Sequence, residues 1–121
     1  MKLWVDDMRT APPGYVWCQS VNQAKHKIET IERRINRLNE IQRERHLDPS
    51  RWINIKIEII NIDHDAGEYA NDGGDYICLL DWLEQTGRNY PICIHSMNPV
   101  GVENMRRIIR RNGWTEVKEE Y

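Results

Sequence analysis

Three short polar clusters, each placed directly after an apolar run, hold the side chains of this sequence that could do chemistry. Asp6 and Asp7 follow "LWV", the "DHD" of residues 63–65 follows a run of isoleucines, and the "HS" of residues 95–96 follows "ICI". Carboxylates that converge repel one another unless a cation or a shared proton offsets their charge. Magnesium takes one or two protein carboxylates and completes its shell with water and phosphate oxygens. The clusters therefore predict either a carboxyl group with a raised pKa or a site for a Mg²⁺-like ion, which a phosphate ligand would fit.

The elements that must position these clusters alternate between strands and helices. Apolar runs predict strands over residues 3–5, 15–18, 52–62, 91–95 and 114–118. Helix signals predict helices over residues 20–45, from Asp75 to Gly87, and from the "SMNPVG" turn to Gly113. This alternation favours a mostly parallel, helix-covered sheet within a single domain, residues 1–121. The clusters then lie at the carboxyl ends of the strands, where open α/β sheets bind ligands.

The first helix is predicted to be unusually long. Ser20 can cap it while Gln23 reaches back in an S-x-x-Q capping box, and the helix should end near Arg45 because Pro49 disfavours helix in Asp48. About 25 residues make a helix of about 37 Å, which would overhang a small sheet. Its outer end is the predicted surface for a partner or a second copy, and a solvated face is the alternative for its mixed charges.

Alternating isoleucines precede the second cluster. Ile53, Ile55, Ile57 and Ile59 alternate with polar residues, which is typical of a strand. The alternation slips at Ile59 and Ile60, which predicts a bulge or two strand segments.

Composition excludes several classes of protein. The 17 Lys and Arg against 19 Asp and Glu give a formal charge of −2, so no global field would recruit nucleic acid or an anionic membrane. The three cysteines show no C-x-x-C spacing, which argues against a disulfide framework or a zinc site. No apolar run approaches the roughly 20 residues that a membrane span needs. We expect a soluble, cytoplasmic protein.

Each cluster also has a structural alternative. The Asp6-Asp7 pair could be only a turn or a cap, and residues 63–65 could start a solvated loop. His95, on an apolar strand, could be a satisfied core histidine. We expect instead that His64, Asp65 and His95 face the same pocket as the aspartates.

The order of these residues resembles that of response-regulator receiver domains. In those domains an acid pair and a central aspartate hold Mg²⁺ and the aspartate accepts phosphate; the matching positions are Asp6, Asp7, Asp63 and Ser96. However, only "MRTAPPG" separates the first two strands, and no final helix follows. The stretches "LWVDDMR-x-x-P-P-G", "NIDHDAG" and "IHSMNPVGVENM" instead resemble cyclic-phosphate processing receiver domains, outside roughly residues 31–53.

This resemblance implies a three-layer, receiver-like (flavodoxin-like) α/β fold and a metal-dependent phosphoesterase. The substrate would be a cyclic phosphate, either a cyclic nucleotide or a 2′,3′-cyclic RNA end, and the cofactor a divalent ion, Mg²⁺ or Mn²⁺. The catalytic residues would be Asp63, His64, His95 and Ser96. The metal ligands would be Asp6, Asp7, Asp63 and Asp65. The phosphate-binding residues would be Arg9, Ser96, Asn98 and Asn104. Either histidine could shuttle protons, because its ordinary pKa lies near 6.5.

Three other interpretations stay open. Asp63 could act as a nucleophile and form an aspartyl phosphate. The chain could be a phosphoacceptor receiver in a signalling relay, for which Lys118 is a weak match to the receiver lysine. It could also be a non-catalytic interaction module or a homo-oligomer that uses the long helix.

Overall fold

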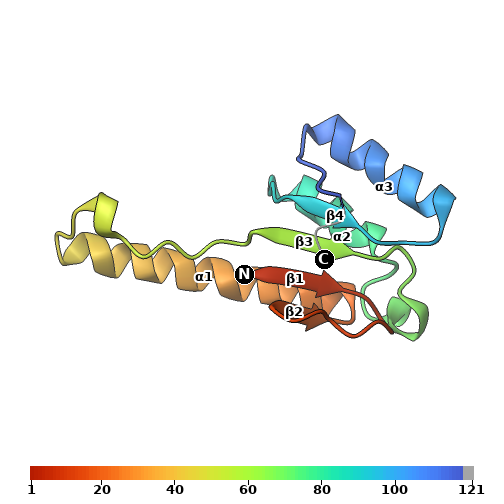
Figure 1. Ribbon diagram of the computed structural model, residues 1–121, viewed down its shortest axis with the longest axis horizontal. Helices are drawn as coiled ribbons and strands as arrows, with labels where there is room; N and C mark the ends of the chain where they lie inside the picture. Colours follow the sequence, from red (N-terminus) through yellow and green to blue (C-terminus); the bar gives the residue numbers. More distant parts are fainter. Residues whose placement is uncertain (119–121) are drawn as a thin grey trace.

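The computed structural model describes residues 1–118, which form a four-stranded parallel sheet in the order β2-β1-β3-β4 (Figure 1). The strands are β1 (Lys2–Val5), β2 (Tyr15–Cys18), β3 (Ile59–Ile62) and β4 (Ile92–Ile94). In the central pair, Lys2 of β1 lies opposite Ile59 of β3 and Val5 opposite Ile62. All four carboxyl ends therefore meet at one edge of the sheet. The predicted α/β class with a parallel sheet is confirmed.

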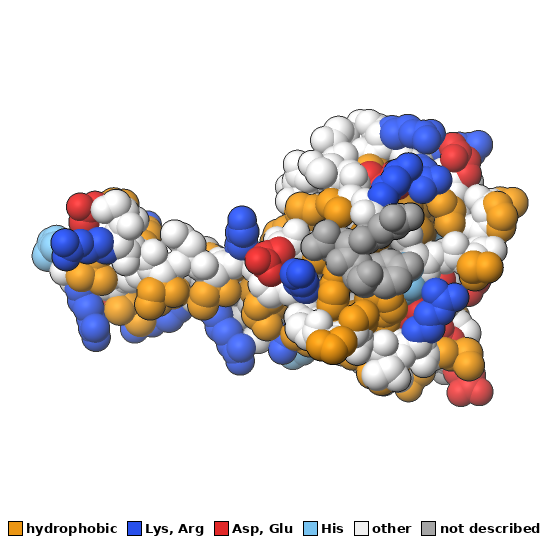
Figure 2. All heavy atoms as spheres, in the orientation of Figure 1, with side chains coloured by type: hydrophobic (Ala, Val, Ile, Leu, Met, Phe, Trp, Pro, Cys, Tyr) orange, Lys and Arg blue, Asp and Glu red, His pale blue; other side chains and the backbone are white. Residues whose placement is uncertain are grey.

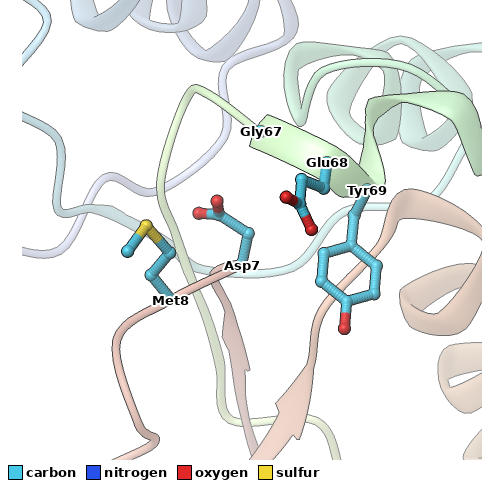
Figure 3. A pocket seen from close by; sticks show the side chains of 5 residues that line it. All are labelled: Asp7, Met8, Gly67, Glu68 and Tyr69. Atoms are coloured by element: carbon cyan, nitrogen blue, oxygen red, sulfur yellow. The ribbon is translucent and has the colours of Figure 1, made fainter.

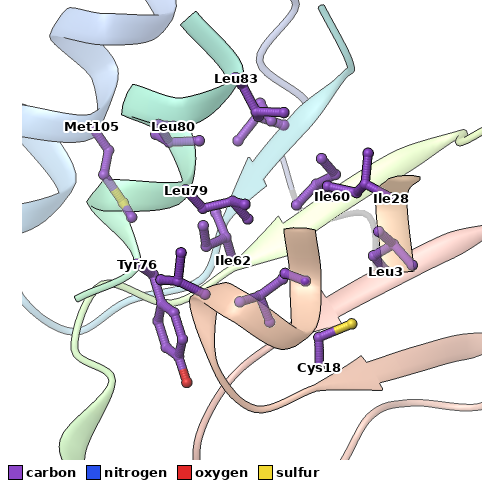
Figure 4. Packing of buried hydrophobic residues seen from close by; sticks show 14 of the residues in the cluster. Leu3, Cys18, Ile28, Ile60, Ile62, Tyr76, Leu79, Leu80, Leu83 and Met105 are labelled. Atoms are coloured by element: carbon purple, nitrogen blue, oxygen red, sulfur yellow. The ribbon is translucent and has the colours of Figure 1, made fainter. Parts of the chain in front are cut away.

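Three helices cover and extend this sheet. They are α1 (Val21–Glu44), α2 (Ile77–Gln85) and α3 (Pro99–Asn112), and two 3-10 turns, η1 (Pro49–Arg51) and η2 (Gly67–Asn71), lie between them. Apolar side chains of α1 and α2 pack on the sheet in one core (Figure 4). Its fully buried members include Leu3, Val5, Ile28, Ile60, Ile62, Leu79, Leu80 and Leu83. Within residues 1–118, no helix is both long and apolar enough to cross a membrane.

Side-chain caps set the ends of the helices. Ser20 Oγ accepts a hydrogen bond from Gln23 N–H at 3.0 Å, as predicted, but Gln23 Oε1 accepts from Gln19 N–H and not from Ser20. Asn98 Oδ1 accepts from Gly101 N–H at 3.0 Å at the start of α3. Gly113 ends α3 in the left-handed conformation, with φ at 67°, which glycine adopts without steric cost. The predicted start of α1 at Ser20 and the predicted end of α3 at Gly113 are confirmed.

Residues 52–58 are not part of a strand, so the strand predicted there begins only at Ile59 and the predicted bulge is absent. Gln42 on α1 holds this segment instead, because its side chain accepts from Ile53 N–H at 2.7 Å and donates to Ile53 O at 3.3 Å. The neighbouring strand β1 starts at Lys2, opposite Ile59, and no strand of residues 1–118 extends further back. With the outer part of α1, this segment forms a protruding arm, defined here as residues 33–56 (Figure 1).

Two further sequence expectations are wrong in detail. Asp75 does not cap α2; its carboxylate accepts a hydrogen bond from Ala66 N–H, and the helix begins after Tyr76. The strand expected over residues 114–118 reduces to a single parallel bridge between Glu116 and Ile92. The predicted domain extends to Tyr121, and its last three residues, 119–121, lie outside the described residues.

Candidate functional site

Three carboxylates meet at the carboxyl edge of the sheet. Asp6 and Asp7 follow β1 and Asp63 follows β3, and one oxygen of each lies within 4.8 Å of the others. Asp63 is held there because its N–H donates to Val5 O at 2.9 Å, which continues the pairing of β1 with β3. We call these three side chains the carboxylate group. It is the only set of three potential metal ligands of this kind among residues 1–118.

Asp6 is buried and uses its carboxylate to shape the loop after β1. Its Oδ1 accepts from Met8 N–H at 2.9 Å and Arg9 N–H at 2.8 Å, while Oδ2 lies 2.8 Å from Nε2 of His95. These contacts occupy much of its capacity as an acceptor. Asp7 and Asp63 therefore have more oxygen lone pairs available for a cation.

His95 lies beneath the carboxylate group. It is 3% exposed, its Nδ1 contacts Asn61 Oδ1, and its ring stacks on Trp4 with centroids 3.9 Å apart. Burial lowers the pKa of His95 and outweighs the raising effects of its hydrogen bond to the Asp6 carboxylate and of the charges on Asp6 and Asp63. We expected this ring to face the pocket, but the structure uses it to support Asp6 from within the protein.

His64 lies closer to solvent and is oriented by its neighbours. Its Nδ1 lies 2.9 Å from Oδ1 of Asp65 and 3.4 Å from Nδ2 of Asn98, and its side chain is 15% exposed. The ring packs on the first turn of α3, where a Cβ added to Gly101 would lie 2.4 Å from its Cγ. These contacts leave Nε2 without a hydrogen-bond partner among the described residues. Asp65 thus pairs with the histidine and lies outside the carboxylate group.

The predicted phosphate-binding residues are spread around this edge. Ser96 Oγ accepts from Asn98 N–H at 3.2 Å, so both lie in the turn between β4 and α3. The charge of Arg9 is near enough to help lower the pKa of His95. Asn104 lies further along α3, is half-buried and makes no side-chain hydrogen bond within residues 1–118.

The carboxylate group has the chemistry of a site for a hard divalent cation. The pKa of Asp7 is raised by burial, and the charges of Asp6 and Asp63 raise it further. No Lys or Arg within residues 1–118 forms a salt bridge with any of the three. Mutually repelling carboxylates without a Lys or Arg partner match the all-oxygen donor set that Mg²⁺ and Mn²⁺ prefer. The residues present therefore fit such an ion.

A cavity of about 300 Å³ opens beside this group (Figure 3). It is lined by Asp7, Met8, Gly67, Glu68 and Tyr69. A Cβ on Gly67 would lie 2.3 Å from Oδ2 of Asp7, so the close approach of η2 to this carboxylate requires glycine.

Sequence reasoning missed some residues of this edge. Asn61 contacts His95 from within β3, and the signal was a lone amide inside the isoleucine-rich strand "IINI". The apolar run around Trp4 predicts only a strand residue, although its ring stacks on His95. Glu68 and Tyr69 lie in a loop whose polar composition gave no indication of a cavity.

The sequence was compared with models of known protein families. The model of the cyclic-phosphate processing receiver domain family matches residues 1–111. The chain belongs to this family. The match confirms the receiver-like fold class and connects the domain with cyclic-phosphate processing. No curated protein and no solved structure matched the chain.

Proposed function

We propose that this receiver domain is a metal-dependent phosphoesterase that hydrolyses a cyclic phosphate, either a cyclic nucleotide or a 2′,3′-cyclic RNA end. The observation that carries the proposal is the carboxylate group at the carboxyl edge of the sheet, three acidic side chains whose oxygens lie within 4.8 Å of one another. His64, which directly follows Asp63, is oriented by the carboxylate of Asp65. The family match supports processing of a cyclic phosphate, and the hydrolytic reaction is our inference.

Asp7 and Asp63 would hold Mg²⁺ or Mn²⁺, with Asp6 as a third, largely committed neighbour. When bound, such an ion would offset the carboxylate charge, polarise the phosphoryl group and favour attack by water. Arg9, Ser96, Asn98 and Asn104 would contact the non-bridging oxygens of the phosphate. Arg9 is the only one of these four that carries a positive charge.

His64 would act as the general acid. Asp65 and Asn98 contact its Nδ1, so its Nε2–H would face the substrate and give a proton to the departing ribose oxygen. Water attacks phosphorus, the bond between phosphorus and that oxygen breaks, and the histidine regains a proton from the attacking water. The product is a phosphate monoester with one free hydroxyl. In this scheme His95 is a positioning residue, because it contacts Asp6 and lies beneath the site.

The proposal is tested by metal-dependent turnover of 2′,3′-cyclic nucleotides. His64→Ala should lower turnover by about a hundredfold or more, the usual contribution of a general acid, and should leave Mg²⁺ binding nearly unchanged. His26→Ala, an exposed histidine of α1, is the matched control and should retain full turnover. If wild-type protein opens no cyclic phosphate but accumulates phosphate on Asp63 from a small phosphodonor, it is a phosphoacceptor receiver and the enzyme proposal is wrong.

The arm favours a second function, association with another copy of the chain. Residues 33–56 hold seven Lys or Arg and three Asp or Glu, whereas the rest of the chain holds ten and sixteen. Ile53 is 65% exposed and Ile55 is 41% exposed, and Figure 2 shows hydrophobic side chains along the arm with basic side chains around them. Like charges would oppose the pairing of two arms. We infer that each arm docks on the acidic body of its partner.

Sedimentation velocity tests this association. The chain should form a dimer at low salt that weakens as salt rises, because exposed charges are screened. Ile53→Asp combined with Ile55→Asp should abolish the dimer. Gln85→Asp, which adds a negative charge at an exposed position of α2, should leave it intact. A monomer at every concentration in low salt would contradict the inference.

A further inference from the structure

The cavity beside Asp7 has walls that the phosphoryl chemistry does not use. Met8 is 81% exposed and Tyr69 is half-buried. In Figure 3, Met8 and Tyr69 flank Asp7 on opposite sides, and Glu68 lies between Asp7 and the tyrosine ring. A phosphate needs hydrogen-bond donors, and neither the thioether of Met8 nor the face of the Tyr69 ring supplies one. This part of the site therefore suits an apolar, planar group.

The size and composition of the cavity match a nucleobase. Its volume of about 300 Å³ lies at the lower end of small-molecule pockets. Proteins commonly hold an unpaired base by stacking it on aromatic and apolar side chains. Tyr69 offers a ring, and Met8 offers a polarizable thioether that can contact aromatic groups favourably.

The carboxylate of Glu68 adds a polar contact at the same cavity. It is exposed and makes no hydrogen bond or salt bridge with other residues in 1–118. A carboxylate accepts hydrogen bonds from exocyclic amino groups, such as N4 of cytosine. Adenine, cytosine and guanine carry such a group and uracil does not, so Glu68 would favour the amino-bearing bases.

The cavity is also held in place relative to the carboxylate group. Tyr69 N–H donates to Ala66 O at 2.9 Å, and Ala66 N–H donates to the Asp75 carboxylate at 3.1 Å. Gly67 brings this turn directly against Asp7. A ligand whose phosphate lies at the carboxylate group and whose flat group lies on Tyr69 would thus contact two preformed halves of one site.

We propose that this cavity binds the nucleobase of the substrate, so that the domain acts on cyclic nucleotides or RNA ends and discriminates against cyclic phosphates that lack a base. The inference rests on the proposed function. It names Tyr69 and Met8 as stacking residues and Glu68 as the residue that selects amino-bearing bases.

The first test compares adenosine 2′,3′-cyclic phosphate with methyl riboside 2,3-cyclic phosphate, which carries a methoxy group in place of the base. Stacking on one aromatic residue gives roughly a 5-fold to 150-fold preference, and we expect kcat/KM to differ by that factor. Tyr69→Ala should remove most of this preference and Tyr69→Phe should keep it. Met97→Ala, an exposed methionine that does not line the cavity, is the matched control. Equal kcat/KM for both substrates in wild-type protein would overturn the inference and leave the hydrolase proposal standing.

A second variant tests the pocket independently, in case Tyr69→Ala does not fold. Glu68→Gln changes only an exposed carboxylate, and we expect it to reduce the preference for adenosine over uridine cyclic phosphate several-fold. Binding is measured separately by saturation-transfer NMR with adenosine 2′-monophosphate and ribose 5-phosphate. Saturation of the base protons that is lost in Tyr69→Ala would support the pocket even if no cyclic phosphate were hydrolysed. Absence of that saturation in wild-type protein would show that the pocket assignment is wrong.

Discussion

Neutralising Asp7 should make the metal-free protein more stable. Its carboxylate lies within 4.8 Å of both Asp6 and Asp63, and the charges of both raise its pKa in addition to the effect of burial. Two unit charges at that distance repel by about 3.5 kcal/mol at an effective dielectric constant of about 20, and by about 0.9 kcal/mol in water. Asp7 is half-buried and faces two such neighbours, so we expect Asp7→Asn to stabilise the metal-free protein by about 1 to 2 kcal/mol.

The sign of this effect should reverse when the metal is present. An ion that binds only the native state adds about 2.7 kcal/mol at a hundredfold excess over Kd, and Asp7→Asn removes a principal ligand. The wild type should therefore be the more stable protein in saturating Mg²⁺, and the variant the more stable one in EDTA. Thermal unfolding followed by circular dichroism should show Tm differences of a few degrees in opposite directions.

A control and a refuting result complete this test. Glu44→Gln, which removes an exposed charge on the arm, should change neither Tm order nor the response to metal. If Asp7→Asn lowers Tm in EDTA and Mg²⁺ stabilises neither protein, the carboxylates do not form a cation site. Repulsion among Asp6, Asp7 and Asp63 would then not limit the stability of the metal-free protein.

Two further predictions concern Glu32 in the middle of α1 and Gly101 in the first turn of α3. Burial raises the pKa of Glu32, but hydrogen bonds from Arg88 and Tyr90 and the charge of Arg88 lower it more, so the folded-state pKa lies below the ordinary value. The stabilising effect of the ionised Glu32 carboxylate is therefore present near neutral pH and is lost as the pH falls through the folded-state pKa. Urea unfolding should show that Glu32→Gln costs about 1 kcal/mol at neutral pH and progressively less below about pH 4; an unchanged cost at acid pH would contradict this. Gly101→Ala should displace the ring of His64, since the new Cβ would lie 2.4 Å from it, and should lower turnover at least about tenfold while the Mg²⁺-induced rise in Tm persists. Full turnover in this variant would show that the ring orientation is not needed.

The parallel sheet and the meeting of the carboxylates were predictable because local signals and parallel topology agree. Apolar runs that end in acid place Asp6 and Asp63 at the same edge once β1 and β3 are parallel neighbours. The caps of α1 and α3 depend on side chains within three residues of the helix start, which a sequence shows directly.

The remaining features depend on contacts far apart in the sequence. Residues 52–58 alternate like a strand, but β1 begins only at Lys2, so the backbone pairing ends at Met1, which bonds Lys56 O and Glu58 N–H, and Gln42 holds Ile53 further out. His95 follows an apolar strand like a surface ligand, but Asn61 and Trp4 enclose it from two other strands. The cavity at Tyr69 depends on the approach of η2 to Asp7, which spacing along the chain does not reveal.

Phosphorus NMR of adenosine 2′,3′-cyclic phosphate incubated with the full chain and Mg²⁺ or Mn²⁺ tests the central claim most directly. We predict that the cyclic signal is replaced by that of a phosphate monoester, that EDTA stops the conversion, and that Asp63→Ala does not support it. Persistence of the cyclic signal with both metals, under conditions in which the wild-type Tm rises with metal, would contradict hydrolysis while leaving the cation site in place.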